Sequence, residues 1–151
     1  MLTKRQFLIG TATALATAPL AAPALAAEPP VFSDRGAAIR GYDPVAYFTL
    51  GEPTEGSDAF THDWNGVTWR FASDAHRAAF AADPVAYAPQ FGGYCAWAVA
   101  EGYTASTIPE AWRIVDGKLY MNFSRRVQRR WERDIPGNIA RGNANWPQVL
   151  A

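Results

Sequence analysis

The chain has 151 residues, and its 14 Lys and Arg balance 14 Asp and Glu, so the formal net charge is zero. Hydrophobic residues make up 49% and aromatic residues 13% of the chain, a composition that excludes an intrinsically disordered protein. A single cysteine excludes an internal disulfide framework and a zinc site built from several cysteines. The length suits one compact domain and argues against a multidomain enzyme.

The first 26 residues have the pattern of an export signal. Lys4 and Arg5 open the chain, and an apolar, Ala-rich run follows over residues 7–20. Ala24-Leu25-Ala26 then supplies small residues at the positions that signal peptidase recognises. The run is too short and too weakly apolar for a stable membrane span. We therefore predict a periplasmic protein whose signal occupies residues 1–26.

The start of this signal also resembles a twin-arginine export motif. The run Thr3-Lys4-Arg5-Gln6-Phe7-Leu8 has Lys in place of the first Arg of that motif. The twin-arginine pathway exports folded proteins, whereas an ordinary signal exports unfolded chains, and both routes stay open. Either route leaves residues 27–151 as the mature domain.

Turn and cap signals predict a hairpin followed by a helix in the first half of the mature chain. Residues 45–48 predict a short strand, and Asn65-Gly66 between β-forming segments is the favoured two-residue hairpin turn. Ser73 is a helix cap, and the helix it begins is expected to end near Ala82. Asp83-Pro84 has the pattern of a further helix start.

The same arrangement recurs 51 residues later. Asp116-Gly117 predicts a second hairpin turn, Ser124 a second helix cap, and Asp134 the end of that helix. Phe123, Val127 and Trp131 are expected to form the apolar face of this helix. Since His76 lies 51 residues before Val127, it is expected to face the core. We interpret the pattern as one hairpin–helix unit used twice, although ordinary hairpin–helix sequence grammar could also produce it.

An apolar segment lies between the two units. Residues 94–101 follow Gly92-Gly93 and are apolar on nearly every side of a helix, which is typical of a buried helix. Cys95 would lie in the first turn, where the helix dipole would lower the pKa of its thiol. The predicted fold is a small single α+β domain of two β-hairpin–helix units packed around this central helix.

Several motifs carry a resemblance to a known family: residues 41–48, 66–73, Phe80 with Asp83-Pro84 and Tyr87, residues 87–98, Ala111-Trp112, residues 115–120 and Trp146-Pro147. These motifs resemble the YHS-domain family, and in particular an extended bacterial branch with a Gly-Gly-Tyr-Cys-Ala-Trp-Ala motif. The resemblance implies a small treble-clef-like domain over about residues 40–150. Members of the family occur beside copper pumps and heavy-metal resistance proteins, so the resemblance also implies metal handling.

The sequence departs from the family at the residues that would bind a metal. The resemblance places cysteines at three positions, which here hold Ala46, Ala72 and His76. Of the side chains at these three positions, only the imidazole of His76 can bind a metal. The family metal site therefore cannot be transferred whole to this chain.

Three side chains remain as candidate ligands of a soft metal. Cys95, His76 and Met121 together would suit Cu(I), which prefers thiolate, thioether and imidazole. Each also has a purely structural interpretation, since a free cysteine, a bonded histidine and a methionine are all common in protein cores. The numerous aromatic residues could likewise line a small-ligand or haem pocket or simply fill the core.

We therefore predict a non-enzymatic, exported protein that binds or handles a soft metal, with copper as the candidate cofactor and a metal ion or small ligand as its partner. Nucleic acid is not expected as a partner of an exported chain. No catalytic sequence motif is present. One alternative is a thiol-dependent redox or enzymatic partner that uses Cys95. Another is an interaction domain that has lost its metal site.

Overall fold

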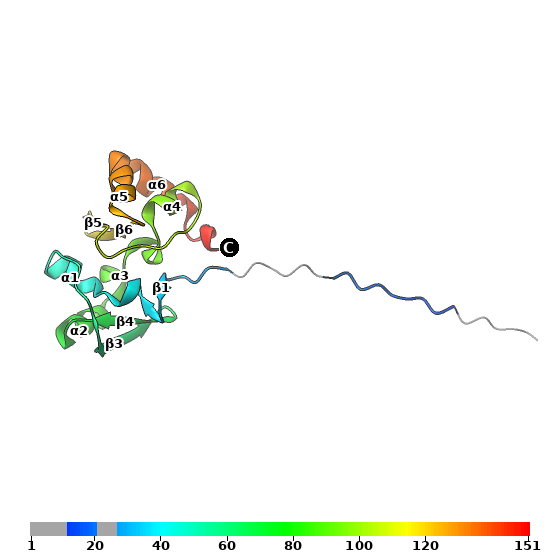
Figure 1. Ribbon diagram of the computed structural model, residues 1–151, viewed down its shortest axis with the longest axis horizontal. Helices are drawn as coiled ribbons and strands as arrows, with labels where there is room; N and C mark the ends of the chain where they lie inside the picture. The colour runs from blue at the N-terminus through cyan, green and yellow to red at the C-terminus, as the bar shows by residue number, and fades with distance from the viewer. Residues whose placement is uncertain (1–11, 21–26) are drawn as a thin grey trace, which may run out of the picture.

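The computed structural model describes residues 12–20 and 27–151 (Figure 1). The basic start and the cleavage site of the predicted export signal lie outside the described residues. Within the described part of the chain, no helix is both long enough and apolar enough to span a bilayer.

The first half of the domain is a four-stranded sheet with three short helices, drawn in cyan and green in the lower part of Figure 1. The spatial order is β1-β2-β4-β3, with β2 parallel to β4 and the other pairs antiparallel. The elements are β1 Ser33–Asp34, β2 Ala37–Ala38, a 3₁₀ turn at Ile39–Gly41, α1 Pro44–Thr49, β3 Ser57–Trp64, β4 Val67–Phe71, α2 Asp74–Ala82 and α3 Pro84–Tyr87.

The second half, in the upper part of Figure 1, pairs a two-stranded sheet with three helices. The elements are η2 Gln90–Gly93, α4 Ala96–Glu101, β5 Trp112–Val115, β6 Lys118–Met121, α5 Arg125–Trp131, η3 Glu132–Asp134, α6 Ile135–Asn145 and η4 Gln148–Leu150. Helix α6 packs on α4, where the Asn145 carboxamide donates to the carbonyls of Val99 and Ala100 at the end of α4. The predicted α+β class is confirmed.

The two predicted hairpin–helix units are present. Asn65 and Asp116, the first residues of the two hairpin turns, both have positive φ, of 52° and 51°. The Ser73 and Ser124 hydroxyls cap α2 and α5 by accepting the N–H of the residue three positions on.

Burial follows the 51-residue offset as well. Phe80 and Trp131 are fully buried, and His76 and Val127 are half-buried, so the core-facing position of His76 is confirmed. The expectation that Phe123 is buried is wrong, since it is 52% exposed. Phe123 precedes the Ser124 cap and so lies outside the helix whose buried face it was expected to join.

The strand predicted at residues 45–48 is also wrong, because these residues form α1. The buried carboxylate of Asp43 accepts the N–H groups of Val45 and Ala46, and Pro44 occupies the first helical position. This is the same start signal that Asp83-Pro84 gives to α3. Cap and proline therefore outweigh the β propensity of the residues that follow.

Strand β6 separates two hydrophobic clusters. Leu119 and Met121 belong to a first cluster with Trp69, while Tyr120 belongs to a second cluster with Trp131. This division follows from alternation of side chains along a strand. Helix α4 lies in the second half with Ala96, Ala98, Val99 and Ala100 buried, as its apolar sequence predicts. It begins one residue after Cys95, which is its N-cap.

Candidate functional site

A fully buried carboxylate lies at the centre of the first half. Asp43 Oδ1 accepts the N–H groups of Val45 at 2.9 Å and Ala46 at 3.2 Å. Its Oδ2 accepts the N–H of Ala72 at 2.9 Å and lies 2.6 Å from His76 Nδ1. Four donors therefore satisfy one buried side chain and tie α1, the end of β4 and α2 together.

The Asp43 contact fixes how His76 presents its ring. When Nδ1 carries the proton and donates to Asp43, Nε2 of the neutral imidazole is an acceptor. Nε2 lies 3.2 Å from the Thr49 hydroxyl, and the His76 side chain is 18% exposed. A carboxylate behind one ring nitrogen is the usual support of a metal-binding histidine and also of a general base.

The side chains of Thr49, His76 and Asp43, in this order, resemble a nucleophile–base–acid triad, but their surroundings do not favour catalysis. The single proton of the Thr49 hydroxyl is shared between two acceptors, since Oγ1 also lies 3.2 Å from the Val45 carbonyl. Neither of the two concave sites described below is lined by His76 or Thr49. The imidazole of His76 is therefore held in place by Asp43, but it lines neither of these two concave sites.

The three positions at which the YHS resemblance places cysteines converge on this carboxylate. Ala46 and Ala72 each contact Asp43 through a backbone N–H, and His76 contacts it through its ring. The structure thus brings the three positions together, but as donors to a carboxylate. No thiol is present among them to bind a metal.

Cys95 occupies the place in the second half that Asp43 occupies in the first half. Like Asp43, it is the N-cap of a helix, and like Asp43 it accepts the N–H of the residue before a serine cap. Phe123 N lies 3.3 Å from its sulfur, as Ala72 N lies 2.9 Å from Asp43. The thiol in turn donates to Asn122 Oδ1 at 3.5 Å.

The predicted lowering of the Cys95 pKa is wrong. Cys95 is 1% exposed, and burial raises the pKa of its thiol above the ordinary value. Backbone N–H groups from Ala98, Phe123 and Trp97 favour the thiolate but offset only part of this rise. The six-residue helix α4 therefore does not outweigh desolvation, and the resting form is the protonated thiol.

A hollow of about 260 Å³, here named the thiol pocket, opens beside Cys95. Val127 stands at the position that His76 occupies in the first half, so no imidazole approaches the sulfur there. The Arg130 guanidinium lies 5.6 Å from the centre of the Trp97 ring. The lining residues are Cys95, Trp97, Ala98, Tyr103, Ala105, Phe123, Val127 and Arg130.

Across the residues that the structure describes, no hydrogen bond or ion pair links the three predicted ligands Cys95, His76 and Met121 to one another. His76 contacts Asp43 and Thr49, and Met121 is 1% exposed in the first hydrophobic cluster. Asn122, next to Met121, instead faces Cys95, in keeping with alternation along the chain. Among residues 12–20 and 27–151, no three or more His, Cys, Asp or Glu side chains are grouped to hold a metal ion.

Sequence reasoning missed Asp43 and Asn122. The Asp43-Pro44 pair is a cap signal that could have been found, but not its contact with His76, 33 residues away. Asn122 is 0% exposed, accepts the N–H of Trp97 at 3.1 Å, and has no partner for Nδ2 among the described groups. It gives no signal in the sequence.

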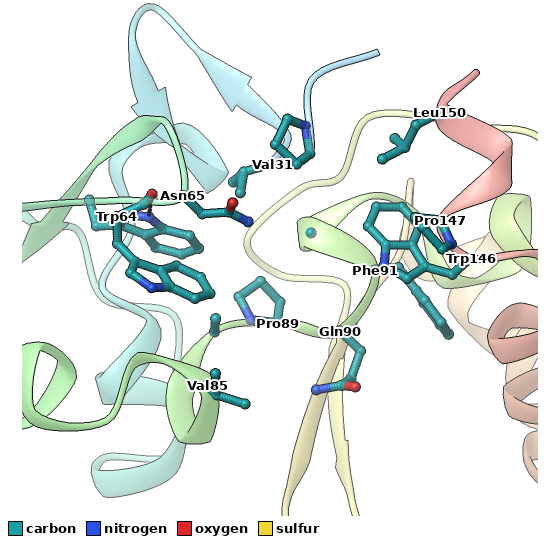
Figure 2. A pocket seen from close by; sticks show the side chains of 14 residues that line it. Val31, Trp64, Asn65, Val85, Pro89, Gln90, Phe91, Trp146, Pro147 and Leu150 are labelled. Carbon is teal, nitrogen blue, oxygen red and sulfur yellow. Dashed lines mark hydrogen bonds between the residues drawn. The ribbon is translucent and has the colours of Figure 1, made fainter. Parts of the chain in front are cut away.

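A second concave site lies where the two halves meet, and we name it the junction cleft. Figure 2 shows Trp64 and Asn65 of the β3–β4 hairpin on one side and Phe91, Trp146 and Pro147 on the other. Its volume is about 270 Å³. The remaining labelled wall residues are Val31, Val85, Pro89, Gln90 and Leu150.

Comparison with known proteins found no matching family model, no matching curated protein and no matching solved structure. The resemblance to the YHS-domain family therefore stays a prediction based on the motifs of the sequence.

Proposed function

We propose that the chain is an exported, non-enzymatic binding protein that holds one soft metal ion, copper in the first place, through the Cys95 thiolate. One observation carries the proposal: the only cysteine of the chain lines an open pocket. A thiolate is the side chain that Cu(I) prefers. Periplasmic localisation rests on the predicted signal at residues 1–26.

The surroundings of the sulfur suit a ligand that becomes charged only when metal is bound. The raised pKa keeps the Cys95 thiol protonated and unreactive whenever no metal is bound. A bound metal ion displaces the thiol proton, because metal binding requires the deprotonated ligand. The N–H of Phe123, already directed at the sulfur, then stabilises the thiolate.

The same features argue against the thiol-dependent enzyme. A nucleophilic cysteine needs a lowered pKa or an adjacent base. Burial raises the pKa of Cys95, and the polar contacts of its sulfur are Asn122 and Phe123. His76 makes its own contacts with Asp43 and Thr49.

Competition for Cu(I) against a coloured chelator tests the proposal. Cys95→Ser is expected to weaken Cu(I) binding at least a hundredfold, because oxygen is a poor ligand for this soft ion. His76→Ala is the matched control, expected to change affinity by no more than about twofold. Met121→Leu is expected to behave like His76→Ala, since Met121 is buried in the first cluster. Equal Cu(I) affinity of the native protein and Cys95→Ser would contradict the proposal.

The arrangement around Asp43 favours a second candidate, an interaction domain without a metal. A carboxylate with four donors stands where the resemblance expects a thiolate set. For this candidate, substitutions at Cys95 and His76 change stability but not copper binding. The chelator competition separates the two candidates.

A further inference from the structure

The junction cleft has the composition of a ligand site and does not depend on the thiol pocket. Its walls come from the β3–β4 hairpin, the segment 88–92 and the two ends of the domain near residues 30 and 147 (Figure 2). Sites between structural units are common places for small ligands. The cleft shares no lining residue with the thiol pocket.

The cleft offers flat apolar surfaces on two sides. The indole of Trp64 packs on the fully buried Trp69, with ring centres 5.9 Å apart. On the other side, Trp146 packs on Phe91 at 6.0 Å. Trp64 and Trp146 thus each contact a second ring that also lines the cleft, and Figure 2 shows these two indoles on opposite sides of the cleft.

The polar groups of the cleft are neutral. None of its fourteen lining residues is Lys, Arg, His, Asp or Glu. The side-chain polar groups are the three indole N–H groups of Trp64, Trp69 and Trp146 and the carboxamides of Asn65 and Gln90. The Trp69 N–H donates to the Trp64 carbonyl, whereas neither carboxamide bonds another of the residues drawn in Figure 2. Asn65 extends from the hairpin turn toward the space between the walls (Figure 2).

These features define the ligand by size, shape and charge. A volume of about 270 Å³ lies just below the range of pockets for drug-sized molecules, so it fits one or two rings. A charged group would lose its hydration without gaining a countercharge. Flat walls favour a planar ring, and a carboxamide binds best to a group with both a donor and an acceptor.

We propose that the junction cleft binds a neutral, planar ring compound that carries an amide-like edge. The ring lies between the walls formed by Trp64 and Trp146. The edge pairs with the carboxamide of Asn65. This site is separate from the copper site, so either proposal can fail without the other.

Three probes of similar size test the proposal: benzamide, benzoate and cyclohexanecarboxamide. Binding is followed through the indole N–H resonances of Trp64 and Trp146 in NMR titrations of the mature protein. Benzamide is expected to shift both resonances with a Kd of about 1 mM, a normal affinity for so small a ligand. Benzoate is expected to bind at least about tenfold more weakly because its charge is unpaired. Cyclohexanecarboxamide is expected to bind about fivefold more weakly because it has no flat ring.

One substitution removes a carboxamide without disturbing the fold. Asn65→Gly keeps a residue that accepts the positive φ of the hairpin turn. It is expected to weaken benzamide binding about fivefold, the value of one hydrogen bond. Asp116→Gly makes the same change in the other hairpin and is expected to leave binding unaltered.

Three results would overturn the proposal. The first is that neither indole resonance shifts at 10 mM benzamide. The second is equal affinity for benzamide and benzoate, which would remove the argument from charge. The third is an equal effect of Asn65→Gly and Asp116→Gly. Repeating the titration with Cys95→Ser separates this site from the copper site, and an unchanged Kd is expected.

Discussion

Removal of the Asp43 carboxylate is predicted to destabilise the domain more than removal of any exposed helix cap. In Asp43→Ala, the N–H groups of Val45, Ala46 and Ala72 and the Nδ1 of His76 all lose their acceptor. A buried donor left unpaired costs about 1–3 kcal/mol. Since Ala72 is exposed and His76 partly so, water can reach some of these groups, and the lower value applies. Four donors at about 1 kcal/mol each give a loss of about 4 kcal/mol.

The matched control is Asp83→Ala. Asp83 also precedes a proline and caps a helix, but it is exposed and its side chain accepts only the N–H of Ala86. Loss of this cap is expected to cost about 1 kcal/mol or less. Asp43→Asn is expected to fall between the two, because it keeps one oxygen for the start of α1 and turns an NH₂ group toward the N–H of Ala72.

Urea unfolding followed by far-UV circular dichroism measures these differences. A loss of about 4 kcal/mol is a large share of the 5–15 kcal/mol that stabilises a typical domain, so the midpoint of Asp43→Ala is expected to drop clearly. Equal midpoints for Asp43→Ala and Asp83→Ala would refute the reasoning that Asp43 organises the first half.

Two further predictions concern alkaline pH and a glycine. Burial raises the pKa of both Cys95 and Tyr47, so the folded state keeps protons that the unfolded chain releases above about pH 8.5 and about pH 10. Their stabilising contribution is complete below those values and declines as pH rises, by up to about 1.4 kcal/mol per pH unit for each group. Urea unfolding from pH 8 to 11 should show this decline in the free energy of unfolding, and Cys95→Ala should show a shallower one. A free energy of unfolding that does not change over this pH range would contradict the prediction. Gly92→Ala is expected to cost about 3 kcal/mol in the same assay, since a Cβ would lie 2.0 Å from the Pro30 carbonyl oxygen at a φ of +61°. Gly117→Ala, with a φ of +74° but nothing within 4 Å, is expected to cost only about 1 kcal/mol, and equal costs would contradict the predicted clash.

Local signals were enough to predict the two hairpin–helix units. The Asn65-Gly66 and Asp116-Gly117 turns need positive φ, and serine caps need only their own helix, so all of these depend on neighbouring residues. Helix α1 was missed because its apolar residues suit a strand and only the Asp-Pro start indicates a helix. The same Asp-Pro pair at Asp83-Pro84 correctly predicts the start of α3, so this signal was also available at Asp43-Pro44.

The candidate site could be predicted only in part. The core-facing position of His76 followed from the 51-residue offset, but its carboxylate partner Asp43 lies at the start of another helix. The pKa of Cys95 depends on how much of the chain covers its sulfur, which no local pattern records. The junction cleft likewise unites residues from about 30 to about 150, so its aromatic walls could not be separated from core residues by sequence.

The central claim is that Cys95 holds a soft metal ion, and native mass spectrometry tests it most directly. The protein is isolated from the periplasm without a metal-affinity step, beside Cys95→Ser. We predict the mass of a chain beginning at Ala27 with one added copper ion for the native protein, and the bare chain mass for Cys95→Ser. Bare chain masses for both proteins, or copper retained by Cys95→Ser, would contradict it.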